Sequence, residues 1–306
     1  MPPASTTGQR AHATSSEASL MDAFDAALPG ISPGVFDAAD FRAIAEIAHK
    51  EAGIVLPEGK AMLVFARLSP LVRNTNCATF ASYVIRIRED VAERRRAICA
   101  LTASRSTFYQ HPHQFEHFAQ TVRPGYVERL LGGGKVRLWS AGCASGADAW
   151  TMLITLLGDD VAQGEALAKA DLRLLGTDIA TPAIATARAA TYRTEDLKPL
   201  PAPLRQAWTQ PHGEHSTIAP QIQQLTRFRA HNLLGEWPMQ GQFDTIFCRT
   251  ALRHFDDSTR ERLVLRLAEQ LTPGGWLYLG DGDVVSPATG EVLVPAGPAT
   301  YQKRTV

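Results

Sequence analysis

The segment 136–178 constrains the fold of this chain more than any other part of the sequence. It reads as a short apolar strand, a turn containing Gly142 and Gly146, an amphipathic helix, and a second apolar strand that ends in Asp178. This order is typical of the nucleotide-binding half of a doubly wound parallel sheet, in which the acid reaches ribose hydroxyls. The glycines do not spell G-x-G-x-x-G, so the turn alone is equally compatible with a ligand site and with a plain turn.

Strands and helices alternate from residue 136 onward, which predicts a parallel sheet in an α/β domain over 115–306. The predicted strands are 136–140, 172–177, 243–248 and 276–279, and the predicted helices are 148–157, 182–190 and 258–271. Residues 204–230 break this rhythm with polar and β-prone residues, so we expect a small antiparallel insertion there. The runs 291–295 and 300–303 predict a closing hairpin.

A helical region precedes the sheet. Residues 1–30 are rich in small and polar residues without periodicity, so we expect a flexible tail. Over 35–105, apolar residues recur at helical spacing, which predicts a helical bundle whose first helix is capped by Asp37 or Asp40. A connecting helix is expected at 115–131, before three glycines. The helices of the bundle are expected from Asp40 onward and at 58–73, 78–87 and 91–101.

Composition narrows the class of protein. The 306 residues are 45% hydrophobic, and 31 basic residues balance 31 acidic ones. Zero net charge gives no global field for nucleic acid, and no apolar run approaches the roughly 20 residues that span a membrane. The N-terminus has no apolar signal core. We therefore expect a globular cytoplasmic protein without membrane insertion, and the four cysteines, which form no C-x-x-C pair, predict neither a metal site nor a disulfide framework.

Two predicted helices of the bundle carry basic residues: Lys60, Arg67 and Arg73 on one, and Arg94, Arg95 and Arg96 on the other. Two interpretations stay open. These residues form either ordinary solvated helix faces or a docking face for an acidic helical partner.

Seven short runs in one order are far more specific than any of them alone. They are Ala-Gly-Ile-Val-Leu at 52–56, followed by Lys60 and Arg67, Leu-Thr-Ala-Ser-Arg-Ser-Thr-Phe-Tyr-Gln at 101–110, Leu-Trp-Ser-Ala-Gly-Cys-Ala-Ser-Gly at 138–146, Gly-Thr-Asp-Ile at 176–179, Asn-Leu-Leu at 232–234, Phe-Asp-Thr-Ile-Phe-Cys-Arg at 243–249 and His-Phe-Asp at 254–256. From about Phe36 to Lys303 the chain thus resembles the glutamate methyltransferases of bacterial chemotaxis receptors, the CheR family.

The resemblance implies a Rossmann-like class I methyltransferase sheet, an N-terminal helical domain and a small β insertion. It implies S-adenosyl-L-methionine as cofactor, S-adenosyl-L-homocysteine as product, and a glutamate carboxylate of a chemoreceptor's acidic helical segment as acceptor. This chemistry needs no metal, because the sulfonium methyl is already activated. It needs no strong general base either, because glutamate is ionised at neutral pH.

By position, the resemblance assigns cofactor binding to Ser104, Ser106, Gln110, Asp148, Asp178, Asn232, Leu233, Arg249 and Thr250. It implies that Asp178 binds the ribose hydroxyls, that Asp148 lies near the methionine end, and that Asn232 and Leu233 bracket the adenine. Asp148 corresponds to the second acid of the family's Gly-Glu-Glu turn, whose first acid is Ala147 here. The family's Arg-Asn pair is Arg249 with Thr250, which lacks the amide.

The sequence departs from the family at the positions expected to act on the substrate. The run Asn-x-Thr-x-x-x-Arg ends in neutral Gln110, a loss on the order of 1.5–3 kcal/mol for a charged donor beside a carboxylate. Arg105 and Arg253 are alternative cations. The tyrosine expected near the methyl group is His254, which can donate or accept a proton near neutrality, so His254 and Gln110 are the candidate catalytic residues. Gly-Asp-Gly-Asp at 280–283 predicts a more acidic site mouth.

Three functions stay open on this basis. The first is an active methyltransferase acting on a protein carboxylate. The second is a methyltransferase with another acceptor. The third is a divergent homologue that binds the cofactor or its product and works as a regulatory binding module.

Overall fold

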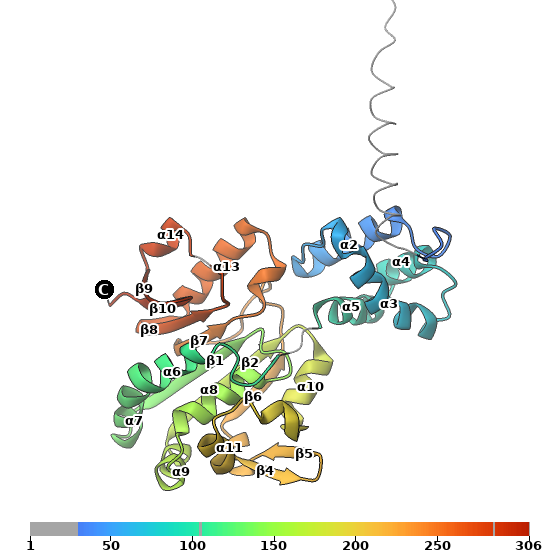
Figure 1. Ribbon diagram of the computed structural model, residues 1–306. Coiled ribbons are helices and arrows are strands. Elements are labelled where there is room, and N and C mark those ends of the chain that lie inside the picture. The colour runs from blue at the N-terminus through green and yellow to red at the C-terminus, as the bar shows by residue number, and fades with distance from the viewer. Residues whose placement is uncertain (1–29, 104–105, 284, 306) are drawn as a thin grey trace, which may run out of the picture. The chain divides into compact units, whose positions relative to one another are not determined.

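The computed structural model describes residues 30–103, 106–283 and 285–305. Ser104, Arg105 and all but the last residue of the expected tail lie outside these ranges. The chain divides into two compact units after Leu101 (Figure 1). Among the described residues, no helix combines the length and the apolar character needed to cross a membrane.

The N-terminal unit is helical. Its described part contains α2 (Ala38–Ala52), the short turn η1 (Glu58–Lys60), α3 (Ala61–Asn74), α4 (Phe80–Glu89) and α5 (Val91–Thr102). Asp37 caps α2, because its carboxylate accepts from the backbone N–H groups of Ala39 at 2.8 Å and Asp40 at 2.9 Å. The α-helix predicted from residue 58 begins three residues later, at Ala61, and the 3-10 turn η1 occupies the residues before it.

The second unit is built on a seven-stranded sheet in the order β6-β2-β1-β7-β8-β10-β9. Its strands are β1 (Lys135–Ala141), β2 (Asp171–Asp178), β6 (Thr226–Ala230), β7 (Phe243–Cys248), β8 (Leu271–Leu279), β9 (Leu293–Gly297) and β10 (Thr300–Lys303). The first five run parallel to one another, and β10 pairs antiparallel with β8 and β9. The mixed α/β fold and the closing hairpin that the sequence predicts are confirmed.

Helices cover both faces of this sheet (Figure 1). They are α6 (Pro112–His117), the π-helical segment η2 (Phe118–Val122), α7 (Arg123–Leu131), α8 (Ala147–Leu157), α9 (Val161–Lys169), α10 (Thr181–Ala189) and α13 (Asp257–Glu269). Successive β1 side chains alternate between faces: Leu138 packs in one buried cluster with α8, and Trp139 packs in another with α13. Because side chains on both faces of the sheet are buried, a shift of β1 by one residue would place every one of its side chains in the wrong cluster.

The order of the strands creates a switch point between β1 and β7. From β1 the chain moves to β2 and β6 on one side, then returns to β7 and β8 on the other. Ligands of such sheets bind outside the carboxyl ends of the strands at this place. We therefore expect a ligand-binding site at the loops after β1 and β7.

The expected insertion is present, but with different bounds. A small antiparallel sheet has the order β3-β5-β4, formed by β3 (Thr191–Arg193), β4 (Thr209–His212) and β5 (His215–Ile218), with η3 (Thr194–Leu197), α11 (Ala202–Trp208) and α12 (Pro220–Gln223) beside its strands in the sequence. Residues 226–230, which the sequence groups with the insertion, instead form β6 and pair with β2. Strand β8 also begins five residues before the predicted 276, through Pro273 and Gly274.

Candidate functional site

The turn after β1 has an unusual backbone. Gly142 (φ 71°), Ala144 (φ 46°) and Gly146 (φ 91°) all adopt left-handed conformations. Glycine takes this conformation at little cost, whereas it is strained for alanine. Ala144 is held there because its N–H donates to Asp178 Oδ2 at 2.8 Å, and because the N–H of the preceding Cys143 donates to the Thr177 carbonyl at 2.9 Å. The turn and the end of β2 are thus built as one unit.

The same turn leads into the N-terminus of α8. Gly146 precedes this helix and no side chain caps it, so the first backbone N–H groups of α8 keep donor capacity. Ser145 is fixed on two sides: the Tyr192 hydroxyl donates to its carbonyl at 2.6 Å, and its Oγ lies 2.8 Å from Ser106 Oγ. Ser106, a predicted cofactor residue, therefore contacts the glycine turn directly.

An ion pair crosses the switch point. Asp148, in the first turn of α8, accepts from Arg249 Nε at 2.9 Å and from Arg249 Nη2, while Arg249 follows the last residue of β7. The side chains are only 10% and 2% exposed, respectively. Such bidentate pairing compensates a buried carboxylate for the loss of its water, because two charge-assisted hydrogen bonds replace it.

Arg249 makes further contacts that hold it in place. Its Nη1 donates to the Gln110 carbonyl and to Gln114 Oε1 at 3.2 Å, and its guanidinium carbon lies 4.8 Å from the centre of the Phe115 ring. Predicted site residues Asp148, Gln110 and Arg249 are therefore brought together. Gln110 takes part through its backbone, and its side chain is exposed.

No cation among the described residues contacts the Asp178 carboxylate. Its Oδ2 accepts from the Ala144 N–H and its Oδ1 from the Ala180 N–H, both at 2.8 Å. Burial raises the pKa of Asp178, while the backbone N–H groups of Ala180, Ala144 and Ile179 act in the opposite direction. A carboxylate has about four acceptor sites, so after these three N–H groups about one stays available for a donor of a ligand.

The segment after β6 carries the next two predicted residues. Asn232 Oδ1 accepts from the Leu234 N–H at 3.0 Å, which is a local turn contact, and the His231 N–H donates to the Asp178 carbonyl at 2.8 Å. Leu233 is buried in the cluster on the α13 face. The backbone thus brings the Asn-Leu pair to the carboxyl end of β2, beside Asp178.

Thr250 and His254 follow β7. The Thr250 hydroxyl donates to the Gly142 carbonyl at 3.2 Å, which ties the loop after β7 to the loop after β1. A Cβ added at Gly142 would lie 2.7 Å from Ala251 Cβ, so this close approach requires glycine. His254 is half-buried in η4 (Leu252–His254), and its N–H donates to the Ala251 carbonyl at 3.2 Å.

The acidic residues after β8 have partners. The Asp281 carboxylate contacts His111 Nδ1 and lies 3.7 Å from His113 Nε2. Asp283 accepts from the Gly280 N–H at 3.1 Å, and burial raises its pKa. The acidic residues expected at 280–283 therefore lie against two histidine rings and a backbone donor, a feature that sequence reasoning missed.

Sequence reasoning also missed Gln114. This residue is fully buried and lies on the same helical face as Phe118 and Val122, at spacings of four. A polar residue within an apolar helical stripe was the available signal. The second unit thus contains a polar network that joins α6, α8 and β7.

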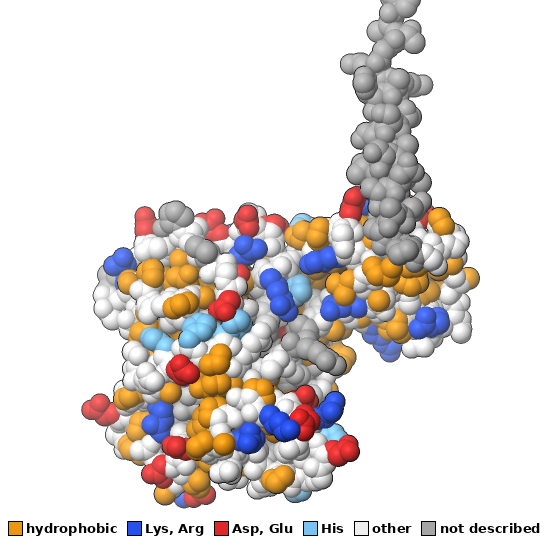
Figure 2. All heavy atoms as spheres, viewed as in Figure 1, with side chains coloured by type: hydrophobic (Ala, Val, Ile, Leu, Met, Phe, Trp, Pro, Cys, Tyr) orange, Lys and Arg blue, Asp and Glu red, His pale blue; other side chains and the backbone are white. Residues whose placement is uncertain are grey.

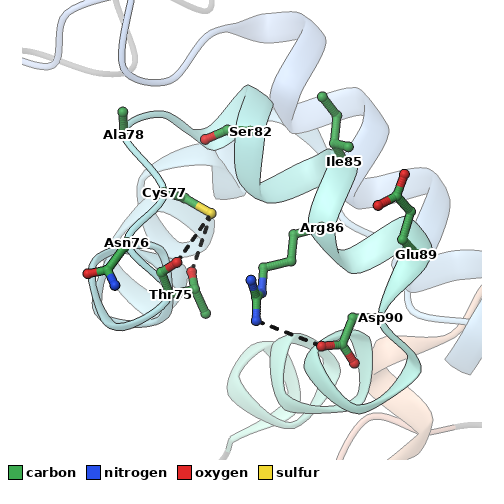
Figure 3. A pocket seen from close by; sticks show the side chains of 9 residues that line it. All are labelled: Thr75, Asn76, Cys77, Ala78, Ser82, Ile85, Arg86, Glu89 and Asp90. Carbon is green, nitrogen blue, oxygen red and sulfur yellow. Dashed lines mark hydrogen bonds and ion pairs between the residues drawn. The ribbon is translucent and has the colours of Figure 1, made fainter.

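The N-terminal unit has a separate cavity of about 540 Å³ beside the start of α4. Figure 3 shows Cys77, Arg86 and Asp90 among its lining side chains. None of the predicted site residues lines it.

The basic residues of this unit are partly used within it. Arg94 pairs with Glu51 at 3.1 Å, Arg96 pairs with Glu93 at 3.1 Å, and Arg67 donates to the Leu101 carbonyl. Basic and acidic side chains are interspersed on the face seen in Figure 2.

A doubly wound sheet with acids and a basic residue at the carboxyl ends of the strands beside its switch point is typical of enzymes that bind a nucleotide-like cofactor. Comparison with known proteins makes the class specific. Residues 104–296 match the family model for the CheR methyltransferase SAM-binding domain, and residues 39–102 match the CheR methyltransferase all-alpha domain. The chain belongs to the CheR methyltransferase family, and it is an S-adenosylmethionine-dependent methyltransferase.

Individual relatives agree over most of the chain. It is 32% identical to a probable chemotaxis protein methyltransferase of Rhizobium etli, over 84% of this chain and 97% of that protein. It is 31% identical to chemotaxis protein methyltransferase 2 of Pseudomonas aeruginosa, over 80% and 86%. It is 32% identical to the chemotaxis protein methyltransferase of Klebsiella aerogenes, over 80% and 83%.

Proposed function

We propose that this chain transfers the methyl group of S-adenosylmethionine to a glutamate carboxylate in an acidic helical segment of a chemoreceptor. The observation that carries the proposal is the buried Asp148–Arg249 pair across the switch point, with Asp178 joined to the same glycine turn. The names of the relatives, which are chemotaxis protein methyltransferases, support the choice of acceptor.

The polar groups at this place match the polar parts of the cofactor. Asp178 keeps about one acceptor site for the ribose hydroxyls beside the backbone N–H groups from which it accepts. Asp148, paired with Arg249, keeps two for the α-ammonium. We assign Asn232 to the adenine edge, with Leu233 as its apolar neighbour.

The cofactor supplies a methyl group on an already activated sulfonium. What this chain supplies is alignment and exclusion of water. The Arg249 guanidinium lies over the buried Phe115 ring, with its central carbon 4.8 Å from the ring centre. We assign this pair to the wall of the site that excludes water. His254 stands where the family carries a tyrosine, and we assign it to orienting the acceptor rather than to removing a proton, since a glutamate acceptor is already ionised.

A helical acidic partner would meet the N-terminal unit through the basic residues that its own contacts leave exposed. Arg73 and Arg95 are exposed, whereas Arg67 and Arg94 have partners inside the unit. We infer that the exposed residues steer the partner and that the half-buried ones stabilise the fold. A cytoplasmic location stays a prediction, which imaging of a tagged full-length chain tests.

The decisive experiment offers the full chain labelled S-adenosylmethionine and an acidic helical receptor segment. We expect label in the segment as an ester that alkali releases. A control segment with glutamine at each glutamate should take up none. Base-stable label would contradict the carboxylate acceptor and indicate attack by nitrogen or carbon.

A methyltransferase with another acceptor is the second candidate. It is favoured by the neutral and exposed side chain of Gln110 at the position where the family carries arginine. Calorimetric titration with S-adenosylmethionine and S-adenosylhomocysteine separates both candidates from a chain without a cofactor site. Binding without transfer to any acceptor would support a regulatory binding module.

A further inference from the structure

Gln114 holds three parts of the second unit together. It lies in α6 and is fully buried. Its Nε2 donates to the carbonyl of Leu279, the last residue of β8, at 2.9 Å, and to the carbonyl of Ala299, just before β10, at 3.4 Å. Its Oε1 accepts from Arg249 Nη1 at 3.2 Å. One side chain therefore links the ends of β7 and β8 with the turn of the closing hairpin.

The amide can take only one orientation in this place. A guanidinium can only donate, and a backbone carbonyl can only accept, so the amide oxygen must face Arg249 and the amide nitrogen must face Leu279 and Ala299. An apolar side chain satisfies neither end. A side chain with donors alone leaves the Arg249 end unmatched.

Arg249 depends on such a contact for its direction. Its Nε and Nη2 are used by Asp148, which leaves Nη1 to define how the guanidinium is tilted between α8 and α6. The Gln110 carbonyl shares Nη1, but it belongs to an exposed residue in an irregular segment. Gln114 is the buried and doubly anchored partner.

We propose that Gln114 is a positioning residue for methyl transfer. By fixing Arg249, it sets the position of the Asp148 carboxylate toward the methionine end of the cofactor, an inference that rests on the proposed role of Asp148. Gln114 does not touch the reacting atoms. Its effect on the cofactor passes through Arg249 and Asp148.

The test is a double-mutant cycle on cofactor-product affinity. Calorimetry with S-adenosylhomocysteine compares the full chain with Gln114→Met, Asp148→Asn and the double variant. We expect Gln114→Met to weaken binding roughly tenfold in the natural chain, but by less than about twofold when Asp148 is already Asn. Additive losses, or unchanged affinity in folded Gln114→Met, would overturn the proposal.

Two further variants keep this test informative. Gln302→Met is the matched control, because the Gln302 amide donates to one carbonyl, that of Gly274 at 3.0 Å, in the same sheet, and its loss should leave affinity unchanged. If Gln114→Met does not fold, Gln114→Asn shortens the side chain by one methylene and should show the same coupling to Asp148. Absence of binding by the natural chain contradicts the proposed function instead, so the two failures are distinguishable.

Discussion

Two aspartates lie near the carboxyl ends of the neighbouring strands β1 and β2, and their hydrogen-bond partners differ. Asp148 lies in the first turn of α8 and pairs with Arg249, a residue 101 positions away. Among the described residues, Asp178, which ends β2, accepts from backbone N–H groups of its own neighbourhood and of the glycine turn. The first acid belongs to a buried ion pair, and the second is a half-buried acid stabilised by backbone dipoles.

The partners of the two acids separate their roles. The Asp148 carboxylate receives two hydrogen bonds from one guanidinium, so a cation compensates its loss of water. Burial raises the pKa of Asp178 against the weaker action of the N–H groups. We therefore expect Asp148 to matter for the stability of the site, and we expect the charge of Asp178, the acid proposed for ligand hydroxyls, to respond to pH.

Removing the cation should have the largest effect. We expect Arg249→Met to lower the free energy of unfolding by about 3–5 kcal/mol, because Asp148 is left buried and charged without a partner. Chemical denaturation measures this loss. Arg137→Met is the matched control: Arg137 pairs with half-exposed Asp171 at 2.7 Å, so it should cost less than about 1 kcal/mol. Equal losses in the two variants would remove the contrast between buried and exposed pairs.

Removing the second acid should weaken cofactor binding more than folding. Asp178→Ala deletes the carboxylate proposed for the ribose hydroxyls, and one charged hydrogen bond corresponds to at least about tenfold in affinity. Calorimetry with S-adenosylmethionine checks this, with Asp171→Ala at the start of the same strand as control. Unchanged affinity in Asp178→Ala would mean that the ribose site lies elsewhere.

The raised pKa of Asp178 predicts a pH dependence with a definite sign. Ribose hydroxyls donate to the ionised carboxylate, so affinity should be constant near neutrality and fall as acid protonates Asp178. Because burial raises its pKa, this fall should begin at a higher pH than for an ordinary aspartate. Titrations with S-adenosylhomocysteine across this range test it. An Asp178→Asn variant should bind weakly and show no such fall.

Restoring a cation at position 110, where the family carries arginine, should raise the rate of carboxyl methylation. The contact of Gln110 with Arg249 is made by its backbone, and its side chain is exposed, so Gln110→Arg can be accommodated without breaking that contact. A charged donor beside a carboxylate is worth about 1.5–3 kcal/mol, which predicts at least a roughly tenfold gain in carboxyl methylation. Gln110→Met should show no gain. A gain in both variants would exclude charge as the cause.

The smallest expected effect concerns the turn that joins the two acids. Ala144 adopts φ 46° while its N–H donates to Asp178. Ala144→Gly relieves this strain and keeps the N–H, so the free energy of unfolding should rise by about 0.5–1 kcal/mol with little change in cofactor affinity. Thermal denaturation measures the gain. A loss of stability would show that the turn holds Ala144 for another reason.

The elements that depend on local patterns could be predicted from the sequence. The apolar runs of β1, β2 and β7 and the glycine turn are recognisable because residues within one element determine them. Strand β8 was predicted too short because Pro273 and Gly274 favour a loop, yet pairing with β7 extends it. Strand β6 was grouped with the insertion because only its distant partner, β2, shows where it belongs.

Short runs of neighbouring residues are enough to indicate the family, the order of the elements and which residues match a cofactor site. The pairing of Asp148 with a cation, the contacts of Asp178 with N–H groups and the bonds of Gln114 to the ends of two strands become apparent only in the folded sheet. The reason is physical: the charge state and orientation of a buried polar group depend on what the folded sheet places against it.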